Sequence, residues 1–336
     1  MSDRQTVAES YEVSSVKTPP VKTHQLFTSP HDSLDLAGYC HPDPNYFHTR
    51  QRLNYLVDHY LCPTVLTERL TDLPRQFVEP RPRLWDRCDW NAIAADQIIG
   101  IEPDLFIRLI ASSAEIEVPI RAYAELSRDH LQTIHPAMMR FVSGICDETG
   151  NLIEVGVWEK EERQHAPIFC RIYQRLVGKR LWPKANSITE LSPEQAAANT
   201  LYRHAIRRIT TEWSAVSMYL WLMAHSTGAL QRAIAQPLQD EVNHLAKFWG
   251  MTRWGFADPP LPRLINMVTQ FATMMSHHQG DRTDSDRILQ IENLRYGAEL
   301  AYIFARVLRQ MCDWDAHLQP DLLAALFGRC PMLKAA

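Results

Sequence analysis

Trp158-Glu-Lys-Glu-Glu-Arg-Gln-His165 and Asp240-Glu-Val-Asn-His244 are the two stretches that decide the fold. Each has an acid directly before a Glu and a His three residues after that Glu. Residues i and i+3 are neighbours on a helix, so each stretch predicts a carboxylate and an imidazole on one helical face. A single Glu-x-x-His arises easily by chance, whereas two copies with the same preceding acid are informative. The alternative is two exposed Glu–His pairs on solvated helix faces.

The pattern around these stretches is helical. Glycine is scarce, with 12 residues, and apolar residues recur at helical rather than alternating spacing. We therefore predict an all-α fold, a four-helix bundle with additional flanking helices. The bundle is expected over about 104–250, on helices 104–134, 152–177, 191–225 and 229–248. Residues 136–150 are read as a connection. Flanking helices are expected at 47–60, 65–73, 261–278, 286–311 and 321–327.

The remaining composition limits the function classes. Residues 1–35 are polar and poor in large apolar side chains, which predicts a mobile tail before a single domain over 36–336. A net charge of −4 gives no general reason to bind nucleic acid. We expect no membrane span, because no apolar run reaches 18 residues. Seven scattered cysteines without a Cys-x-x-Cys pair, and no secretory leader, predict a cytoplasmic protein.

Two Glu-x-x-His helices, each partnered by a Glu from a further helix, are how four-helix bundles hold two iron or manganese ions. The third helix offers Glu212, which is the only acid between Glu194 and Asp240. The first helix offers Glu115, Glu117 and Glu125. On a continuous helix Glu115 shares an apolar face with Ala111, Val118, Pro119, Ala122 and Leu126, whereas the other two share faces with arginines. We therefore predict Glu115, with Glu117 and Glu125 as alternatives.

These residues resemble the soluble acyl-carrier-protein desaturases of the ferritin-like di-iron superfamily. The similar motifs are Trp-x-x-Glu-Glu-x-x-His at 158–165, Asp-Glu-x-x-His at 240–244, Asp-Glu-Thr-Gly at 147–150, and Asp104-x-Phe followed by Glu115-x-x-x-Pro119. The spacing from the first ligand, Glu115, to the second, Glu162, is longer here than in the family. The resemblance implies six metal ligands: Glu115, Glu162, His165, Glu212, Glu241 and His244. It also implies that Asp240 accepts a hydrogen bond from a ligand histidine.

What the resemblance implies for function is an O2-dependent di-iron oxidase or desaturase acting on an acyl or other apolar chain. Related di-iron folds act as N-oxygenases, hydroxylases or halogenases, and a non-catalytic metal-binding bundle is a further alternative. The implied cofactors are two Fe ions, with Mn as an alternative, O2 as co-substrate and an external electron donor such as a ferredoxin-like protein. A homodimer is also implied. Thr211 and Ser214, beside Glu212, are candidates for a hydrogen bond to a metal-bound oxygen species, or for ordinary bonds to the helix backbone.

Basic residues suggest one partner surface. Arg171, Arg175, Lys179, Arg180 and Lys184 lie at the end of the second bundle helix, and Arg203, Arg207 and Arg208 at the start of the third. If these helices form an antiparallel hairpin, the two groups meet in one patch suited to an acidic acyl-carrier protein. The alternative is a solvated face with favourable charges at a helix C-terminus.

Overall fold

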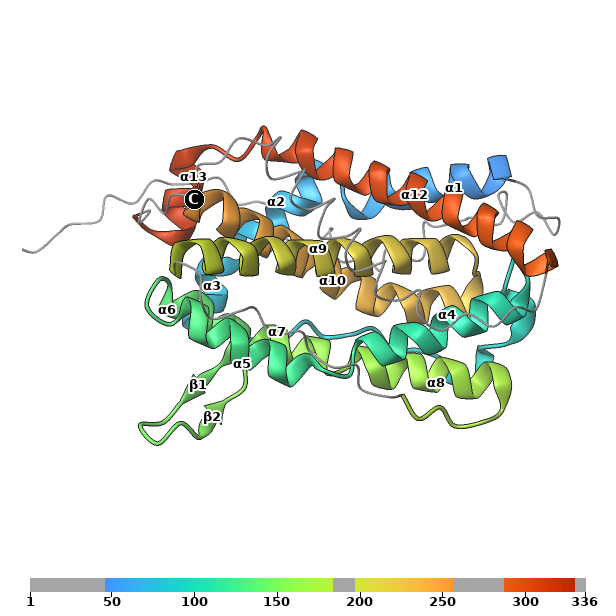
Figure 1. Cartoon of the computed structure of the whole chain (residues 1–336), viewed down its shortest axis with the longest axis horizontal. Helices are drawn as coiled ribbons and strands as arrows, with labels where there is room; N and C mark the ends of the chain where they lie inside the picture. The colour runs from blue at the N-terminus through green and yellow to red at the C-terminus, as the bar shows by residue number, and fades with distance from the viewer. Residues whose placement is uncertain (1–45, 184–196, 257–286, 330–336) are drawn as a thin grey trace, which may run out of the picture. The chain divides into compact units, whose positions relative to one another are not determined.

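The computed structural model describes residues 46–183, 197–256 and 287–329, and the predicted tail 1–35 lies outside them. The described part is mostly helical, as predicted (Figure 1). Its first helices are α1 (Tyr46–Tyr60), α2 (Pro63–Thr71), α3 (Leu73–Val78), α4 (Pro103–Ile116), α5 (Ile120–Leu131) and α6 (Pro136–Ser143), with short 3-10 turns at Trp90–Ala92 and Ala95–Gln97. They are followed by α7 (Val157–Glu162), α8 (His165–Val177), α9 (Ala197–Ala224), α10 (Gly228–Gly255), α12 (Arg287–Asp315) and α13 (Pro320–Phe327).

Three predicted boundaries are corrected. The expected helix 104–134 is two helices, because Pro119 interrupts the backbone hydrogen bonding and disfavours a helical conformation at the residue before it. The expected connection 136–150 contains α6 and the first strand of a small antiparallel hairpin, β1 (Ile145–Cys146) and β2 (Leu152–Glu154). Within the range 152–177, expected to be one helix, residues 152–154 form β2. The helical residues that follow are divided into α7 and α8 at residues 163–164.

The other predicted helices agree with the structure where it describes them. Gly178 ends α8 in the left-handed conformation (φ 75°) that favours glycine at this position. α10 continues to Gly255, beyond the expected residue 248. The beginning of the third bundle helix at Leu191-Ser192-Pro193 and the expected helix 261–278 lie outside the described residues.

Four helical segments surround the core: α4–α5, α7–α8, α9 and α10. α9 and α10 are joined by a short turn and pack along each other, and α4 packs against α8. In Figure 1, α9 and α10 lie between α12 on one side and α4 and α8 on the other. Among the described helices, none combines the length and apolar character needed to cross a bilayer.

The direction of α9 relative to α8 differs from the predicted hairpin. The Arg208 guanidinium lies 5.6 Å from the Trp158 ring, and the Tyr219 ring lies 5.0 Å from the Phe169 ring. Residue numbers therefore rise in the same direction along α7–α8 and along α9. The end of α8 and the start of α9 lie at opposite ends of these segments, so the two basic groups do not form one patch.

Candidate metal centre

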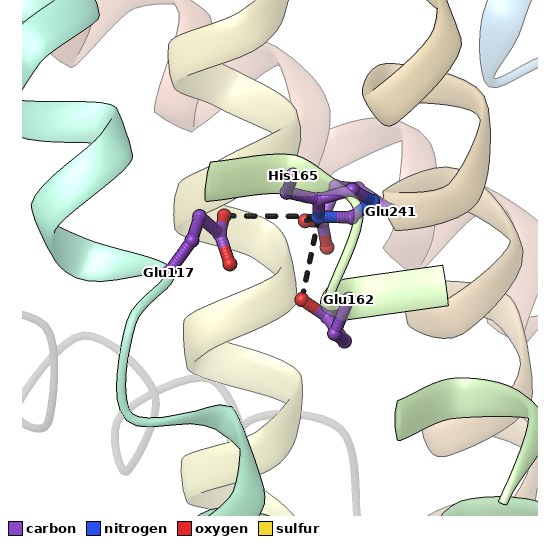
Figure 2. A group of neighbouring side chains, drawn as sticks. All are labelled: Glu117, Glu162, His165 and Glu241. Atoms are coloured by element: carbon purple, nitrogen blue, oxygen red, sulfur yellow. Dashed lines mark ion pairs between the residues drawn. The ribbon is translucent and has the colours of Figure 1, made fainter. Parts of the chain in front are cut away.

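Six acidic and imidazole side chains meet between the four segments. They form two groups of four in which the possible ligand atoms lie within 4.8 Å of one another. One group contains Glu117, Glu162, His165 and Glu241, and the other contains Glu162, Glu212, Glu241 and His244. Glu162 and Glu241 belong to both groups. Figure 2 shows the first group, with Glu117 reaching from the junction of α4 and α5 toward His165.

The break between α4 and α5 positions Glu117. The residue caps α4, and its side chain is 6% exposed. Tyr219 of α9 donates a hydrogen bond to its carboxylate. Glu115 is half-buried and belongs to neither group, whereas Glu125 is exposed and pairs with Arg121. The structure therefore brings Glu117, one of the two predicted alternatives, into the cluster in place of the preferred Glu115, because helical periodicity does not continue through the turn before Pro119.

The two Glu-x-x-His stretches reach the cluster from different local structures. Glu241 and His244 lie within the continuous helix α10. Glu162 is the last residue of α7 and His165 the first of α8. Despite this break, His165 Nδ1 lies 3.3 Å from Glu162, and His244 Nδ1 lies 3.8 Å from Glu241.

Contacts between the stretches are closer than those within them. His165 Nδ1 lies 3.0 Å from Glu241 Oε1, and His244 Nδ1 lies 2.9 Å from Glu162 Oε1. Glu117 and Glu212 complete the two groups at 3.8 Å from His165 Nδ1 and 3.7 Å from His244 Nδ1, respectively. The Nδ1 atoms of both imidazoles therefore face the cluster.

The Nε2 atoms of the imidazoles face away from the cluster and are held reciprocally. His165 Nε2 lies 3.3 Å from Asp240 Oδ2, and His244 Nε2 lies 2.8 Å from Glu161 Oε2. The acid before the Glu of each stretch thus orients the histidine of the other stretch. This geometry agrees with the expectation for Asp240. It adds Glu161, which the symmetry of the two stretches could have indicated.

A segment between α3 and α4 covers the outer side of Asp240. Arg83 Nε donates to Asp240 Oδ1 at 2.6 Å, and Trp85 Nε1 donates to Asp240 Oδ2 at 2.7 Å. The Trp85 ring stacks near the His165 ring, with a 6.1 Å centroid separation. The two hydrogen bonds to Asp240 join residues more than 150 positions apart, and no local sequence pattern predicts them.

Burial and mutual charge shift the pKa values of the cluster. Burial, followed by the charge of Glu162, raises the pKa of Glu117 to about 7. Burial, with the charges of Glu162 and Glu212, raises the pKa of Glu241 well above its ordinary range. Burial alone would raise the pKa of Glu162 also, but the two imidazoles hold it below its ordinary range. Burial opposes protonation of His165, but the charge of Glu162 raises the pKa of this imidazole. The cluster therefore holds four carboxylates and only two imidazoles that could carry positive charge.

Three buried atoms of the cluster suit metal ligation. His165 Nδ1, His244 Nδ1 and Glu241 Oε2 make no hydrogen bond of good geometry, although each imidazole Nδ1 lies within 3.0 Å of a carboxylate oxygen. Buried polar atoms are normally satisfied, so these three atoms are candidate metal ligands. Four carboxylates balance two divalent ions, and carboxylate with imidazole is a donor set that suits iron or manganese.

Other predicted residues have different surroundings. The hydroxyls of Thr211 and Ser214 donate to the backbone carbonyls of Arg208 and Thr210, both at 2.8 Å. This geometry matches the second of the two alternatives, in which both hydroxyls bond to the helix backbone. In the basic groups, Arg171 and Arg175 are exposed, Lys184 lies outside the described residues, and Arg208 is buried at 2% exposure. Arg208 therefore cannot belong to a surface for an acidic partner.

No family model, curated protein or solved structure matches the chain. The functional argument therefore depends on the geometry of the site itself.

Proposed function

We propose that this chain is a non-haem di-iron oxidase of ferritin-like architecture that uses O2 to remove hydrogen from an acyl or other apolar chain. The observation that carries the proposal is the pair of buried donor groups sharing Glu162 and Glu241, in which three buried side-chain atoms make no hydrogen bond of good geometry. Parallel α8 and α9 require a long connection, which is also a property of ferritin-like bundles.

In this proposal Glu117 and His165 would hold one ion and Glu212 and His244 the other, and Glu162 and Glu241 belong to both donor groups. When bound, two iron ions supply O2 activation and the oxidising power to break an unactivated C–H bond. For desaturation, a –CH2–CH2– unit, O2, two electrons and two protons give –CH=CH– and two water molecules. A ferredoxin-like protein is the proposed source of the two electrons.

The chain's own residues orient the ligands and exclude water. Asp240 and Glu161 fix each imidazole with Nδ1 toward the cluster, which also fixes its tautomer. Tyr219 holds the Glu117 carboxylate from the α9 side. The half-buried Trp85 connects through Asp240 to His165, so it offers a short route from outside to the cluster for electrons.

Metal loading tests the proposal. Protein reconstituted with Fe(II) without oxygen should hold about two ions per chain, and its reduced form should consume O2. Glu162→Gln should abolish both properties, because Glu162 belongs to both groups. Glu159→Gln is the matched control, since Glu159 is a buried acid of the same helix outside the cluster.

The outcomes separate the function classes. Less than about one ion per chain in the parent protein, or equal loading in the two variants, would refute the metal centre. Two ions per chain without O2 consumption would indicate a non-catalytic metal-binding bundle. Product analysis after turnover distinguishes a new double bond from hydroxylation, halogenation or N-oxygenation.

A further inference from the structure

A buried positive charge lies beside the candidate metal centre. Arg208 is in the first half of α9, and its side chain is 2% exposed. Glu212 follows it by four residues on the same helix and is also buried, so the two side chains are neighbours on one helical face. The proposed reaction does not use Arg208, although a buried charge is costly unless other charges compensate it.

Aromatic rings hold the guanidinium of Arg208 in place. It lies 4.5 Å from the centroid of the Tyr123 ring and 5.6 Å from that of the Trp158 ring. Trp158 in turn lies against His244, with 6.3 Å between the two ring centroids. These cation–π contacts therefore fix the position of the positive charge next to side chains of the cluster.

The charge of Arg208 acts on two carboxylates of the cluster. Burial lowers the pKa of the guanidinium from its ordinary value, and the negative charges of Glu212 and Glu162 oppose this change. Arginine remains protonated in proteins, so its charge is permanent. Glu212 belongs to one of the two donor groups and Glu162 to both.

Two other cations near the cluster pair with acids that are not in the donor groups. Arg83 pairs with Asp240 at 2.6 Å, and Lys247 pairs with Asp72 at 2.8 Å. The four carboxylates of the donor groups balance the charge of two divalent ions. Arg208 therefore adds one positive charge to a set of charges that is balanced without it.

We propose that Arg208 tunes the metal centre, in that its fixed positive charge weakens the binding of the divalent ions and disfavours their oxidation to the trivalent state. This inference rests on the metal centre of the proposed function. Oxidation adds one positive charge to each ion, so a nearby cation opposes the trivalent state more strongly than the divalent state. The divalent form, which reacts with O2 in the proposed function, is thereby favoured.

Mn(II) binding tests the effect on affinity, because the electron paramagnetic resonance signal of the free ion reports binding without any reaction with O2. Arg208→Gln should bind the more weakly held ion at least about tenfold more tightly than the parent does. A merely structural role for Arg208 predicts the opposite, since loss of a packing contact would weaken binding.

Two further variants separate charge from packing. Arg208→Lys keeps the positive charge beside Glu212 and should bind Mn(II) nearly as the parent does. Arg203→Gln is the matched control, because Arg203 is an exposed arginine of the same helix whose charge is screened by water and salt. It should leave the affinity for Mn(II) unchanged.

An anaerobic redox titration of the iron-loaded protein tests the effect on oxidation. The midpoint potential of Arg208→Gln should be lower than that of the parent, and that of Arg203→Gln should equal it. The far-ultraviolet circular dichroism of each variant reports whether the fold is intact. If Arg208→Gln does not fold, Arg208→Met fills a similar space without the charge and takes its place with the same expected results.

The outcomes distinguish this inference from the proposed function. Weaker or unchanged Mn(II) binding in the folded uncharged variant, or an unchanged midpoint potential, would overturn the tuning role and leave the metal centre in place. A parent protein that binds neither Mn(II) nor Fe(II) would overturn both. Tighter binding and a lower potential in the uncharged variant, with no O2 consumption by the parent, would support the tuning role and refute the oxidase function.

Discussion

Replacing Glu117 with Gln should have opposite effects on the metal-free protein and on metal loading. The carboxylate is fully buried, and its pKa in the folded protein is about 7 against an ordinary value of 4.5. Because the folded-state pKa is raised, ionised Glu117 destabilises the fold. The penalty is absent below pH 4.5, grows between pH 4.5 and 7, and is complete above pH 7. At about 1.4 kcal/mol per pH unit, it reaches about 3 kcal/mol.

Glu117→Gln removes this penalty and preserves an acceptor for Tyr219. After chelation, the variant should therefore melt about 6 °C higher than the parent at pH 8, and at nearly the same temperature at pH 4. Iron loading should fall from about two ions per chain to about one, because only one of the two groups contains Glu117. The assays are thermal unfolding at both pH values and metal analysis after anaerobic reconstitution.

Glu115→Gln is the control, since Glu115 is half-buried and outside both groups. It should change stability by less than about 0.5 kcal/mol and leave loading intact. Loss of an ion in Glu115→Gln with full loading in Glu117→Gln would show that the turn before Pro119 does not place the ligand. An equal rise in melting temperature at pH 4 and pH 8 would refute the electrostatic explanation.

Three further substitutions test other parts of the structure. Asp240→Asn should weaken metal binding about 10–100-fold, measured by competition with a chelator, since the buried carboxylate no longer orients His165; unchanged affinity would contradict this role. Trp85→Phe removes the hydrogen bond to Asp240 and should slow reduction of the loaded protein by an external donor without lowering its metal content; equal reduction rates would exclude this route. Gly144→Ala should destabilise the fold by more than about 2 kcal/mol in chemical unfolding, because φ is +75° and a Cβ would lie 1.7 Å from the Glu154 carbonyl oxygen. Gly150→Ala, also at positive φ but without a nearby atom, should cost only about 1 kcal/mol, and equal losses would refute the steric argument.

Most residues of the buried cluster can be predicted from the sequence, because they occur in repeated local patterns. Glu162, His165, Glu241 and His244 are identified by spacing alone, and Glu212 by its isolation on an apolar helix. All five meet in the cluster. Helical spacing works for these residues because each comparison stays within about one turn.

The sequence did not predict how two helices are placed relative to each other across a turn or a long connection. Helical periodicity extended through Pro119 favours Glu115, although the proline itself indicates a break in the helix. A short hairpin between the second and third bundle helices would bring the two basic groups together, whereas α8 and α9 run in parallel. Arg83 and Trp85 reach Asp240 through tertiary packing, which a single sequence does not encode as a local pattern.

The crossed acid–histidine contacts make the two stretches a single structural unit. Asp240 orients His165 and Glu161 orients His244, so each stretch supplies the acid that holds the histidine of the other. A substitution at either acid would therefore change the orientation of the histidine in the other stretch, not of the histidine in its own stretch. Divergence at one stretch should therefore be accompanied by change at the other. For the same reason, a designer who wished to move this centre to another scaffold would need to transplant both stretches together.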